Sequence, residues 1–385
     1  MEKADIVIIG GGIVGSSIAW HLTEAGAKNV LVLERESHQG KGSTGKSMGG
    51  VRAQFSSEIN IRLSMYSIPF YADFEWRMDH PSGYRPQGYL FLAMEQKHLD
   101  YLRTNVALQQ SCGLKTVRLV ETDEVRREYP QLVADDIIGG SFCSTDGFVD
   151  PYMSMTGFMQ RASEQGARIW KDAEVTVIEK DGNGICAVVT KKGRVETRNV
   201  VIACGAWSRP VARMVGVDLP VEPLRRMLVP SEPFDKYPHS APMTIDMSTG
   251  FHFRPEGRGF LLAWNDVDET YGDKQWFEPS FLEKVLNHAA ARVTCFENLP
   301  VNPKRAWAGL YEMTPDHHPV LGPVRNVKGL YIATGFSGHG VMHAPATGKL
   351  ISEYILQGKP ELVDASVFAV ERFVEGKLIH ETAVL

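Results

Sequence analysis

The stretch 5-DIVIIGGGIVGSSIAWHLTEAG-26 decides the fold that we expect for this chain. Its apolar run Ile6–Ile9 predicts a short buried strand, and the apolar positions from Ile13 to Leu22 recur with the spacing of a helix that ends at Gly26. The segment 29–34, NVLVLE, follows as a second apolar strand. The chain therefore begins with a β-α-β unit.

Glycines at 10, 12 and 15 give the GxGxxG spacing between this strand and this helix. Such a turn brings backbone N–H groups and the positive end of the helix dipole to a pyrophosphate. Glu34, nineteen positions after Gly15, can accept hydrogen bonds from ribose hydroxyls and would repel a 2′-phosphate. The unit thus predicts an adenine dinucleotide, NAD or FAD. Its predicted contacts are Gly10, Gly12, Ile13, Val14, Gly15, Glu34 and Arg35.

The segment 40-GKGSTGKSMGGVRAQF-55 favours FAD over NAD. Ser43, Thr44 and Lys46 offer donors for further phosphate contacts, and Gly49 and Gly50 allow a flat ring to lie against the backbone beside Val51 and Arg52. A nicotinamide enzyme rarely needs such a loop at this position. The alternative is a solvated, flexible loop.

Composition narrows the class of protein. A length of 385 residues suggests two domains, and 43% hydrophobic residues with a net charge of −5 are typical of a globular enzyme without a nucleic-acid partner. The five cysteines are scattered and contain no CxxC pair, which favours a reducing compartment. We find no signal peptide and no apolar run of roughly 18 residues, so we expect a cytoplasmic protein without a transmembrane segment.

The middle of the chain departs from β-α alternation. GYLFLAM, KTVRLVE and IGGSFCS read as strands of an antiparallel sheet, and Asp150 with Pro151 predicts the start of a helix. A meander with DGNG and KKGR turns follows, and its last strand, NVVIACGAW, should return to the nucleotide crevice. The contacts expected from this part are Val175, which can cover the adenine, and Cys204, Gly205 and Trp207.

A second excursion follows Pro220, with strands in VEPLRRMLV, GFHFRPEGRGFLLAW and KRAWAGLYEMT. In the segment 250–256 the alternation places Phe251 and Phe253 on one face and His252 with Arg254 on the other. This polar face can roof a pocket.

Together, the GxGxxG start and GSTGKSMGGVR, GFVDP, IACGAWS, WAGLYEMTPD and GFSGHGVMHAPATG resemble the D-amino-acid-oxidase-type flavoproteins over nearly the whole chain. Sarcosine oxidase β-subunits, L-proline dehydrogenase β-subunits and glycine oxidases are similar members. The resemblance implies bound FAD, hydride removal from a C–H beside an amine nitrogen, and an imine product. It also implies an α/β plus α+β fold, with a Rossmann-like FAD-binding domain (1–84, 145–219 and 318–385) interleaved with an antiparallel-sheet substrate domain (85–144 and 220–317).

The second glycine cluster, 334-TGFSGHGVMHAP-345, should aim the N-terminus of a helix starting around Val341 to Pro345 at the flavin ring. We place Pro345 in the first turn, where N–H groups have no intrahelical partner. The predicted flavin contacts are Gly335, Gly338, His339, Gly340, Val341 and Met342. His339 has an alternative role as a structural residue that holds the turn.

Two departures from the family pattern bear on the cofactor. Gly309 occupies the position at which some relatives attach the flavin through a cysteine, which implies non-covalent FAD. Met342 stands where oxidase relatives can carry a lysine, which favours a dehydrogenase over an oxidase.

For catalysis we select Arg52, His252 and Tyr311, with Arg225 and Arg226 as alternative cations for a substrate carboxylate. Adjacent His317 and His318 cannot easily face one ion, so we predict no metal. The expected substrate is a small amine or amino acid, with an electron-acceptor protein or partner subunit as a possible partner. Two other readings stay open: a flavoprotein that oxidises a 2-hydroxy acid, and a flavin-binding assembly factor with little turnover.

Overall fold

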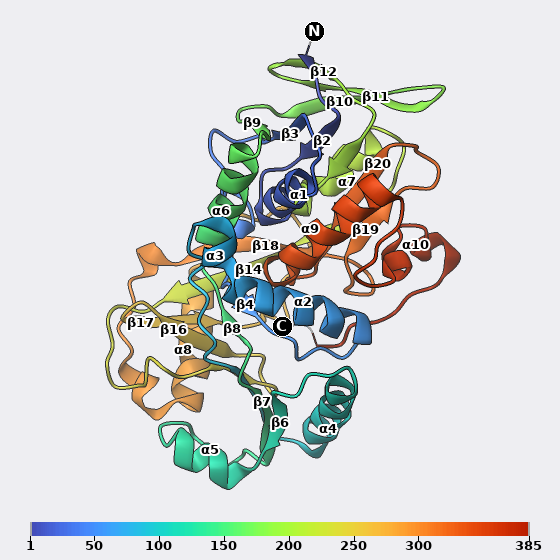
Figure 1. The fold of residues 1–385 in the computed structure, drawn as a ribbon. Helices are drawn as coiled ribbons and strands as arrows, with labels where there is room; N and C mark the ends of the chain where they lie inside the picture. Colours follow the sequence, from blue (N-terminus) through green and yellow to red (C-terminus); the bar gives the residue numbers. More distant parts are fainter. Residues whose placement is uncertain (1, 384–385) are drawn as a thin grey trace.

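A six-stranded sheet forms the centre of the computed structural model, which describes residues 2–383 (Figure 1). Neighbouring strands are parallel except at one edge, where β19 runs antiparallel to β20. In spatial order the strands are β19 (Val320–Pro323), β20 (Leu330–Thr334), β13 (Val200–Ile202), β2 (Ile6–Ile9), β3 (Val30–Leu33) and β9 (Arg168–Trp170). The predicted β-α-β unit is confirmed.

Strand β2 is buried on both faces. Ile6 and Ile8 pack in one hydrophobic cluster with helices, whereas Val7 and Ile9 pack in a second cluster on the other face. This follows from the two-residue repeat of a strand, and it explains why the run carries no polar residue. Most helical residues of the first cluster come from α1 (Ile13–Glu24), α2 (Glu58–Ala72), α3 (Phe74–Met78), α6 (Pro151–Glu164) and α9 (Gly340–Gln357).

The start of α6 is the one predicted from its cap. The Asp150 carboxylate accepts hydrogen bonds from the N–H groups of Tyr152 and Met153, both at 2.9 Å, and Pro151 occupies the first helical position. These donors would otherwise lack a partner in the first turn. The helix therefore begins where local sequence dictates.

The predicted meander forms a four-stranded sheet with the order β1-β12-β11-β10. Its bounds are β10 (Val175–Asp181), β11 (Gly184–Thr190), β12 (Gly193–Glu196) and the unpredicted β1 (Glu2–Lys3), which joins parallel to β12. Valines of β10–β12 belong to the second cluster, to which the short helix α7 (Ser208–Arg213) also contributes. This sheet thus covers the second face of β2.

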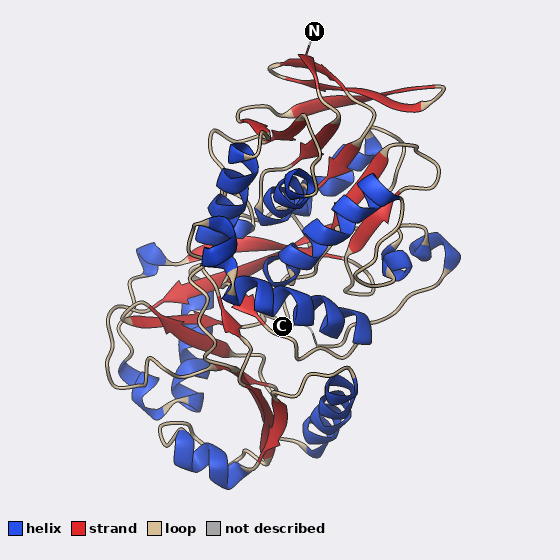
Figure 2. Cartoon of the chain, viewed as in Figure 1, coloured by secondary structure: helices blue, strands red, loops and turns tan. Residues whose placement is uncertain are grey.

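The third large sheet has eight strands in the order β18-β14-β17-β16-β15-β5-β7-β6. Its strands are β5 (Tyr89–Ala93), β6 (Val117–Val120), β7 (Gly139–Cys143), β14 (Glu222–Pro230), β15 (Met243–Asp246), β16 (His252–Glu256), β17 (Gly259–Ala263) and β18 (Trp307–Met313). The remaining elements are α4 (Gln96–Ser111), α5 (Thr122–Glu128), α8 (Ser280–Arg292), α10 (Arg372–Glu375), and the paired β4 (Gly50–Val51) and β8 (Gly147–Phe148). Helices α5 and α8 pack on the face of this sheet that carries Leu90 and Leu92, and α4 packs on the face that carries Phe91 (Figure 2).

One pair in the eight-stranded sheet is parallel, because β5 and β15 come from two separate passes of the chain through it. All other pairs are antiparallel, as predicted. Every strand of this sheet lies within 85–144 or 220–317, and every strand of the six-stranded sheet lies outside those ranges. The domain boundaries themselves stay a prediction.

The position of Pro345 differs from the prediction. Helix α9 begins at Gly340, so Pro345 lies in its second turn and not in its first. Proline lacks the N–H that would bond to the carbonyl four residues earlier. The hydroxyl of Tyr71 donates to this carbonyl, Val341 O, at 2.6 Å and replaces the missing hydrogen bond.

Between residues 2 and 383, no helix combines the length and the apolar character that a membrane crossing requires.

We expect the substitution Gly15→Ala to destabilise the protein. An added Cβ at Gly15 would lie 1.9 Å from the carbonyl oxygen of Gly10, so the strand or the helix must shift, at a cost of about 1–3 kcal/mol. Gly182→Ala in the β10–β11 turn is the control, because its Cβ would meet nothing within 4 Å. Thermal unfolding of both variants checks this. Equal melting temperatures would contradict the close packing of α1 on β2.

Candidate functional site

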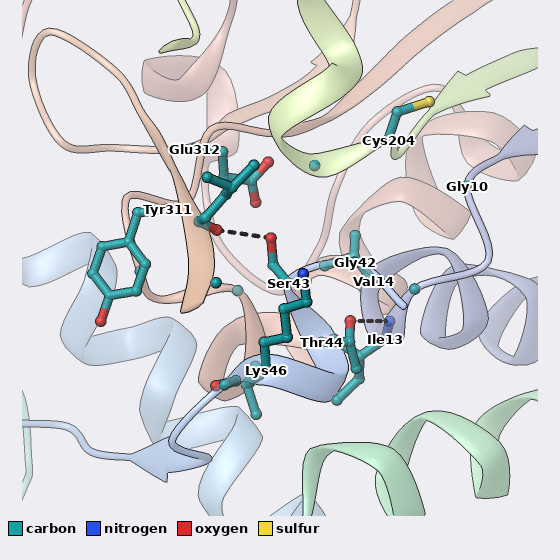
Figure 3. Close-up of a pocket in the computed structure, with 18 of the residues that line it drawn as sticks. Gly10, Ile13, Val14, Gly42, Ser43, Thr44, Lys46, Cys204, Tyr311 and Glu312 are labelled. Carbon is teal, nitrogen blue, oxygen red and sulfur yellow. Dashed lines mark hydrogen bonds between the residues drawn. The ribbon is translucent and has the colours of Figure 1, made fainter. Parts of the chain in front are cut away.

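A cavity of about 660 Å³ is bounded by the carboxyl ends of the central parallel strands and by β14, β16, β17 and β18 of the eight-stranded sheet. The predicted cofactor and substrate residues all line it except Gly15, Gly49, Val51 and Gly335. Residues more than 300 positions apart, such as Gly10 and Tyr311, thus contribute to one site (Figure 3).

The four predicted residues that do not line the cavity lie behind its wall. An added Cβ would lie 1.9 Å from a neighbouring atom at Gly15, 2.3 Å at Gly49 and 2.6 Å at Gly335. Val51 is fully buried in β4. These residues set the close approach of backbone segments and do not face the cavity.

The N-terminal end of α1 faces the cavity and is held by two side chains. The N–H of Gly11 donates to the Glu34 carboxylate at 3.0 Å. The N–H of Ile13 donates to the Thr44 hydroxyl at 3.1 Å (Figure 3). Glu34 is thereby fixed at the end of β3, next to the glycine turn. A carboxylate and a helix N-terminus in this arrangement suit a ribose and a pyrophosphate.

The loop that begins at Gly40 is attached to β18. The Ser43 hydroxyl donates to the carbonyl of Leu310 at 2.7 Å, and the Trp307 indole N–H donates to the carbonyl of Lys46 at 3.0 Å (Figure 3). The lysine side chain itself lines the cavity. The Ser43 hydroxyl is therefore already used inside the protein, whereas the proton of the Thr44 hydroxyl remains free to donate.

At the Glu34 end of the cavity the wall is formed by Val175, Cys204 and Trp207. The guanidinium of Arg35 lies 4.5 Å from the centre of the Trp207 ring. Burial, together with the charge of Glu34, raises the pKa of the Cys204 thiol to about 12. This thiol is neutral at physiological pH and is not a nucleophile.

His252 lies in the part of the cavity formed by the eight-stranded sheet. Its Nδ1 is 3.0 Å from the carbonyl of Gly250, so Nδ1 carries the proton and donates. Burial lowers the pKa of His252 to about 4, and the charges of Arg226 and Arg52 act in the same direction. Nε2 has no hydrogen-bond partner among residues 2–383 and offers a lone pair to the cavity.

Arg225 and Arg226, the two alternative cations for a substrate carboxylate, differ in their surroundings. Arg225 is paired with the nearly buried carboxylate of Glu269 at 2.6 Å and does not line the cavity. Arg226 lines the cavity and has no carboxylate partner in the described chain, and its Nε is buried without any hydrogen bond. Burial lowers its pKa, and its guanidinium lies 5.4 Å from the centre of the Tyr311 ring.

Glu312 is a cavity residue that sequence reasoning missed. It accepts a hydrogen bond from the Thr334 hydroxyl at 2.6 Å, and burial raises its pKa. Strand alternation places Glu312 and Tyr311 on opposite faces of β18, so no local pattern indicated that both border the same cavity. Burial also raises the pKa of Tyr311.

The first turn of α9 closes the cavity beside Tyr311. Gly338 has a φ of +98°, and an added Cβ there would lie 2.5 Å from the tyrosine ring. His339 precedes the helix, lines the cavity and has a buried Nδ1 without a partner. The N–H groups of this turn have no intrahelical acceptor, as expected at a helix start.

Within residues 2–383, no group of three or more histidine, cysteine, aspartate or glutamate side chains is placed to hold a metal ion. His317 and His318 do not line the cavity. The five cysteines are all free thiols.

Comparison with known proteins connects this geometry to a family. The model of the DAO family, described as FAD dependent oxidoreductase, matches residues 5–354. The chain belongs to this family. FAD is its cofactor, and the glycine turn, Glu34 and the start of α9 lie where one extended cavity can receive such a dinucleotide.

Three relatives show which members of the family this chain is similar to. A solved L-proline dehydrogenase from P. horikoshii is 31% identical, with a TM-score of 0.91 over 98% of this chain and all of that chain. FAD-dependent oxidoreductase domain-containing protein 1 from Xenopus laevis is 32% identical over 97% of this chain and 83% of that protein. Human mitochondrial dimethylglycine dehydrogenase is 29% identical over 93% of this chain but only 43% of its own length.

Because several histidines are buried, we expect the folding stability of the protein to fall in mild acid. Burial lowers the pKa to about 3 for His21 and His343, to about 4 for His252 and His318, and well below 6.5 for His339. Histidines of the unfolded chain keep a pKa near 6.5. Between pH 6.5 and 4 the unfolded state therefore binds protons that the folded state does not, so folding stability falls as the pH falls.

The raised pKa values of Asp146, about 6, and of Glu312 act in the opposite direction. These carboxyl groups are fewer than the buried histidines, so we expect the histidines to determine whether stability rises or falls with pH. The melting temperature should fall steadily from pH 7.5 to pH 5, as measured by calorimetry at constant ionic strength. A melting temperature that stays constant or rises over this range would contradict the neutral state of the buried imidazoles.

Proposed function

We propose that the protein is an FAD-dependent dehydrogenase that oxidises the C–N bond of a small amino or imino acid to an imine. The observation that carries this proposal is Arg226, a partly buried cation that faces the cavity with no carboxylate partner among residues 2–383. An unpaired buried charge is costly, and an anionic ligand compensates it. FAD supplies the acceptor for the hydride, and the side chains described here bind and orient the substrate.

In this proposal Arg226 and Tyr311 hold the substrate carboxylate. Their close contact, 5.4 Å from guanidinium carbon to ring centre, places a cation and a hydroxyl on the same wall. The Tyr311 hydroxyl is free of partners among residues 2–383, so it can donate to a carboxylate. Arg52 contributes a second positive charge to the cavity.

His252 interacts with the substrate amine. Its neutral ring presents the Nε2 lone pair, which can accept a hydrogen bond or a proton from the amine. Hydride transfer requires a neutral amine and an α-C–H held close to the acceptor, so orientation is the main task of these residues. The glycine at 309 leaves no thiol at that place in the wall, which supports non-covalent FAD.

Two relatives support an amino-acid substrate with a substituted nitrogen, since their names refer to proline and to dimethylglycine. Both names also say dehydrogenase. Met342 in the cavity wall supports the same preference, because a thioether cannot stabilise the negative charge that forms when oxygen is reduced. An electron-acceptor protein or partner subunit and a cytoplasmic location remain part of the proposal.

Anaerobic mixing with a substrate panel tests the function directly. Loss of the oxidised-flavin absorbance on addition of L-proline, sarcosine, dimethylglycine or glycine is the expected result. Bleaching by 2-hydroxy acids alone would assign the protein to the hydroxy-acid class. No bleaching by any member of the panel would favour a flavin-binding factor with little turnover.

We expect Arg226→Gln to lower kcat/KM for the best substrate. Loss of the charged contact with the carboxylate removes about 2–4 kcal/mol of transition-state stabilisation, which lowers kcat/KM by roughly 30- to 1000-fold. Arg258→Gln on the exposed β16–β17 turn is the control, since Arg258 is far more exposed and pairs only with Asp235. Steady-state kinetics with an artificial dye as acceptor measures both. A fall of less than threefold in Arg226→Gln would remove this residue from the substrate site.

The preference for an acceptor other than oxygen gives a kinetic prediction. Reduction of FAD by substrate should be much faster than reoxidation by air, and a dye should restore turnover. Stopped-flow mixing of reduced protein with oxygenated buffer measures the second rate. Reoxidation at least as fast as reduction would identify a true oxidase.

A further inference from the structure

Residues 381–383 lie against the start of α2, on the side of the molecule where Figure 1 marks the end of the chain. Glu381 is completely buried there. Its carboxylate accepts hydrogen bonds from the N–H of Ser56 at 2.9 Å, the hydroxyl of Ser57 at 2.6 Å and the amide of Asn60 at 3.0 Å. Ser56 precedes α2, Ser57 is its N-cap, and Asn60 donates from its side chain, so the carboxylate lies at the positive end of the helix dipole.

The backbone around Glu381 is fixed as well. Its N–H donates to the carbonyl of Asp316 at 3.0 Å, and its carbonyl accepts from Nδ1 of His317 at 3.1 Å. The hydrogen bonds of the carboxylate lower the pKa of Glu381 to about 2 although burial alone would raise it. An ionised carboxylate therefore anchors the segment at neutral pH.

Two residues later this segment reaches a cavity residue. Arg52, which is 1% exposed, donates through Nη2 to the carbonyl of Ala383 and through Nη1 to the carbonyl of Gln54. Its guanidinium carbon also lies 4.0 Å from the centre of the Phe55 ring. In the described chain, no carboxylate forms an ion pair with Arg52.

This set of partners has an electrostatic consequence. Carbonyl oxygens and a ring face fix the direction of a guanidinium without neutralising it. No carboxylate among residues 2–383 therefore pairs with the charge of Arg52, which acts on His252 and Tyr311. Burial lowers the pKa of His252 and raises that of Tyr311, and the charge of Arg52 adds a smaller lowering effect at both. Glu381, the nearest carboxylate along this segment, is occupied by α2 and cannot pair with it.

We propose that Glu381 is a positioning residue for Arg52. It clamps residues 381–383 to α2, so that the carbonyl of Ala383 holds the guanidinium in the cavity wall as a directed cation with which no carboxylate of residues 2–383 pairs. The inference rests on the cavity being the FAD site and is independent of which substrate is oxidised. A fixed cation there stabilises the negative charge that the flavin gains on reduction.

The test is the midpoint potential of bound FAD, measured by dye equilibration without substrate. Glu381→Gln removes the charge with little change in shape, and Glu381→Ala removes all side-chain contacts. Both should shift the potential to lower values, with the larger shift in the alanine variant. If Glu381→Ala does not fold, Glu381→Gln carries the test alone.

A double-mutant cycle separates positioning from simple stability. In an Arg52→Gln background, Glu381→Gln should give no further shift of the potential while it still lowers the melting temperature. Glu353→Gln is the matched control: Glu353 is a buried carboxylate that caps the N–H groups of Glu361 and Leu362, and its loss should lower the melting temperature only.

Two results would overturn the proposal. The first is a lowered melting temperature with an unchanged potential in both Glu381 variants, which would make the residue a structural cap only. The second is an equal shift with and without Arg52, which would show that Glu381 acts by another route. Because no substrate is present, failure of the proposed amino-acid oxidation leaves this test intact.

Discussion

The close approach of Gly10 and Gly15 is the constraint on which the structure depends. Even a methyl group at Gly15 would lie 1.9 Å from the Gly10 carbonyl oxygen, so α1 starts directly at the end of β2. This places the N-terminus of α1 at the cavity, where Glu34 and Thr44 bind its N–H groups. The same helix packs in the hydrophobic cluster that contains α6 and α9. The position of α9 at the cavity thus depends on a contact near the other end of the chain.

The cavity combines two kinds of wall. The side formed by the six-stranded sheet offers backbone N–H groups and glycines, which suit a cofactor common to the whole family. The side formed by the eight-stranded sheet offers individual side chains, among them Arg226 and His252. Burial keeps the His252 imidazole neutral, and no carboxylate among residues 2–383 pairs with the Arg226 guanidinium. In the proposed function, the six-stranded sheet binds the cofactor and the eight-stranded sheet selects the substrate, so the two properties can change separately.

Local patterns predicted the β-α-β unit and the capped start of α6, and most of the residues that they selected line the cavity, because glycine spacing, caps and strand alternation act over short distances. They did not distinguish Arg225 from Arg226, since that difference depends on a partner 44 positions away, Glu269. Nor did they reveal Glu312 as a cavity residue. The link between Arg52 and Ala383 spans 331 positions and has no sequence signature. The local patterns therefore missed hydrogen bonds and ion pairs between residues that are far apart in the sequence.

The order of strands in the six-stranded sheet affects how the protein folds while the ribosome synthesises it. Strand β2 pairs with β13, and β13 in turn pairs with β20, which ends at Thr334. A growing chain therefore exposes one edge of its N-terminal apolar strand until residue 202 emerges from the ribosome, and the sheet stays incomplete until residue 334 follows. At about 5–20 residues per second this wait lasts on the order of ten seconds or more, long enough for chaperones to engage an unpaired strand.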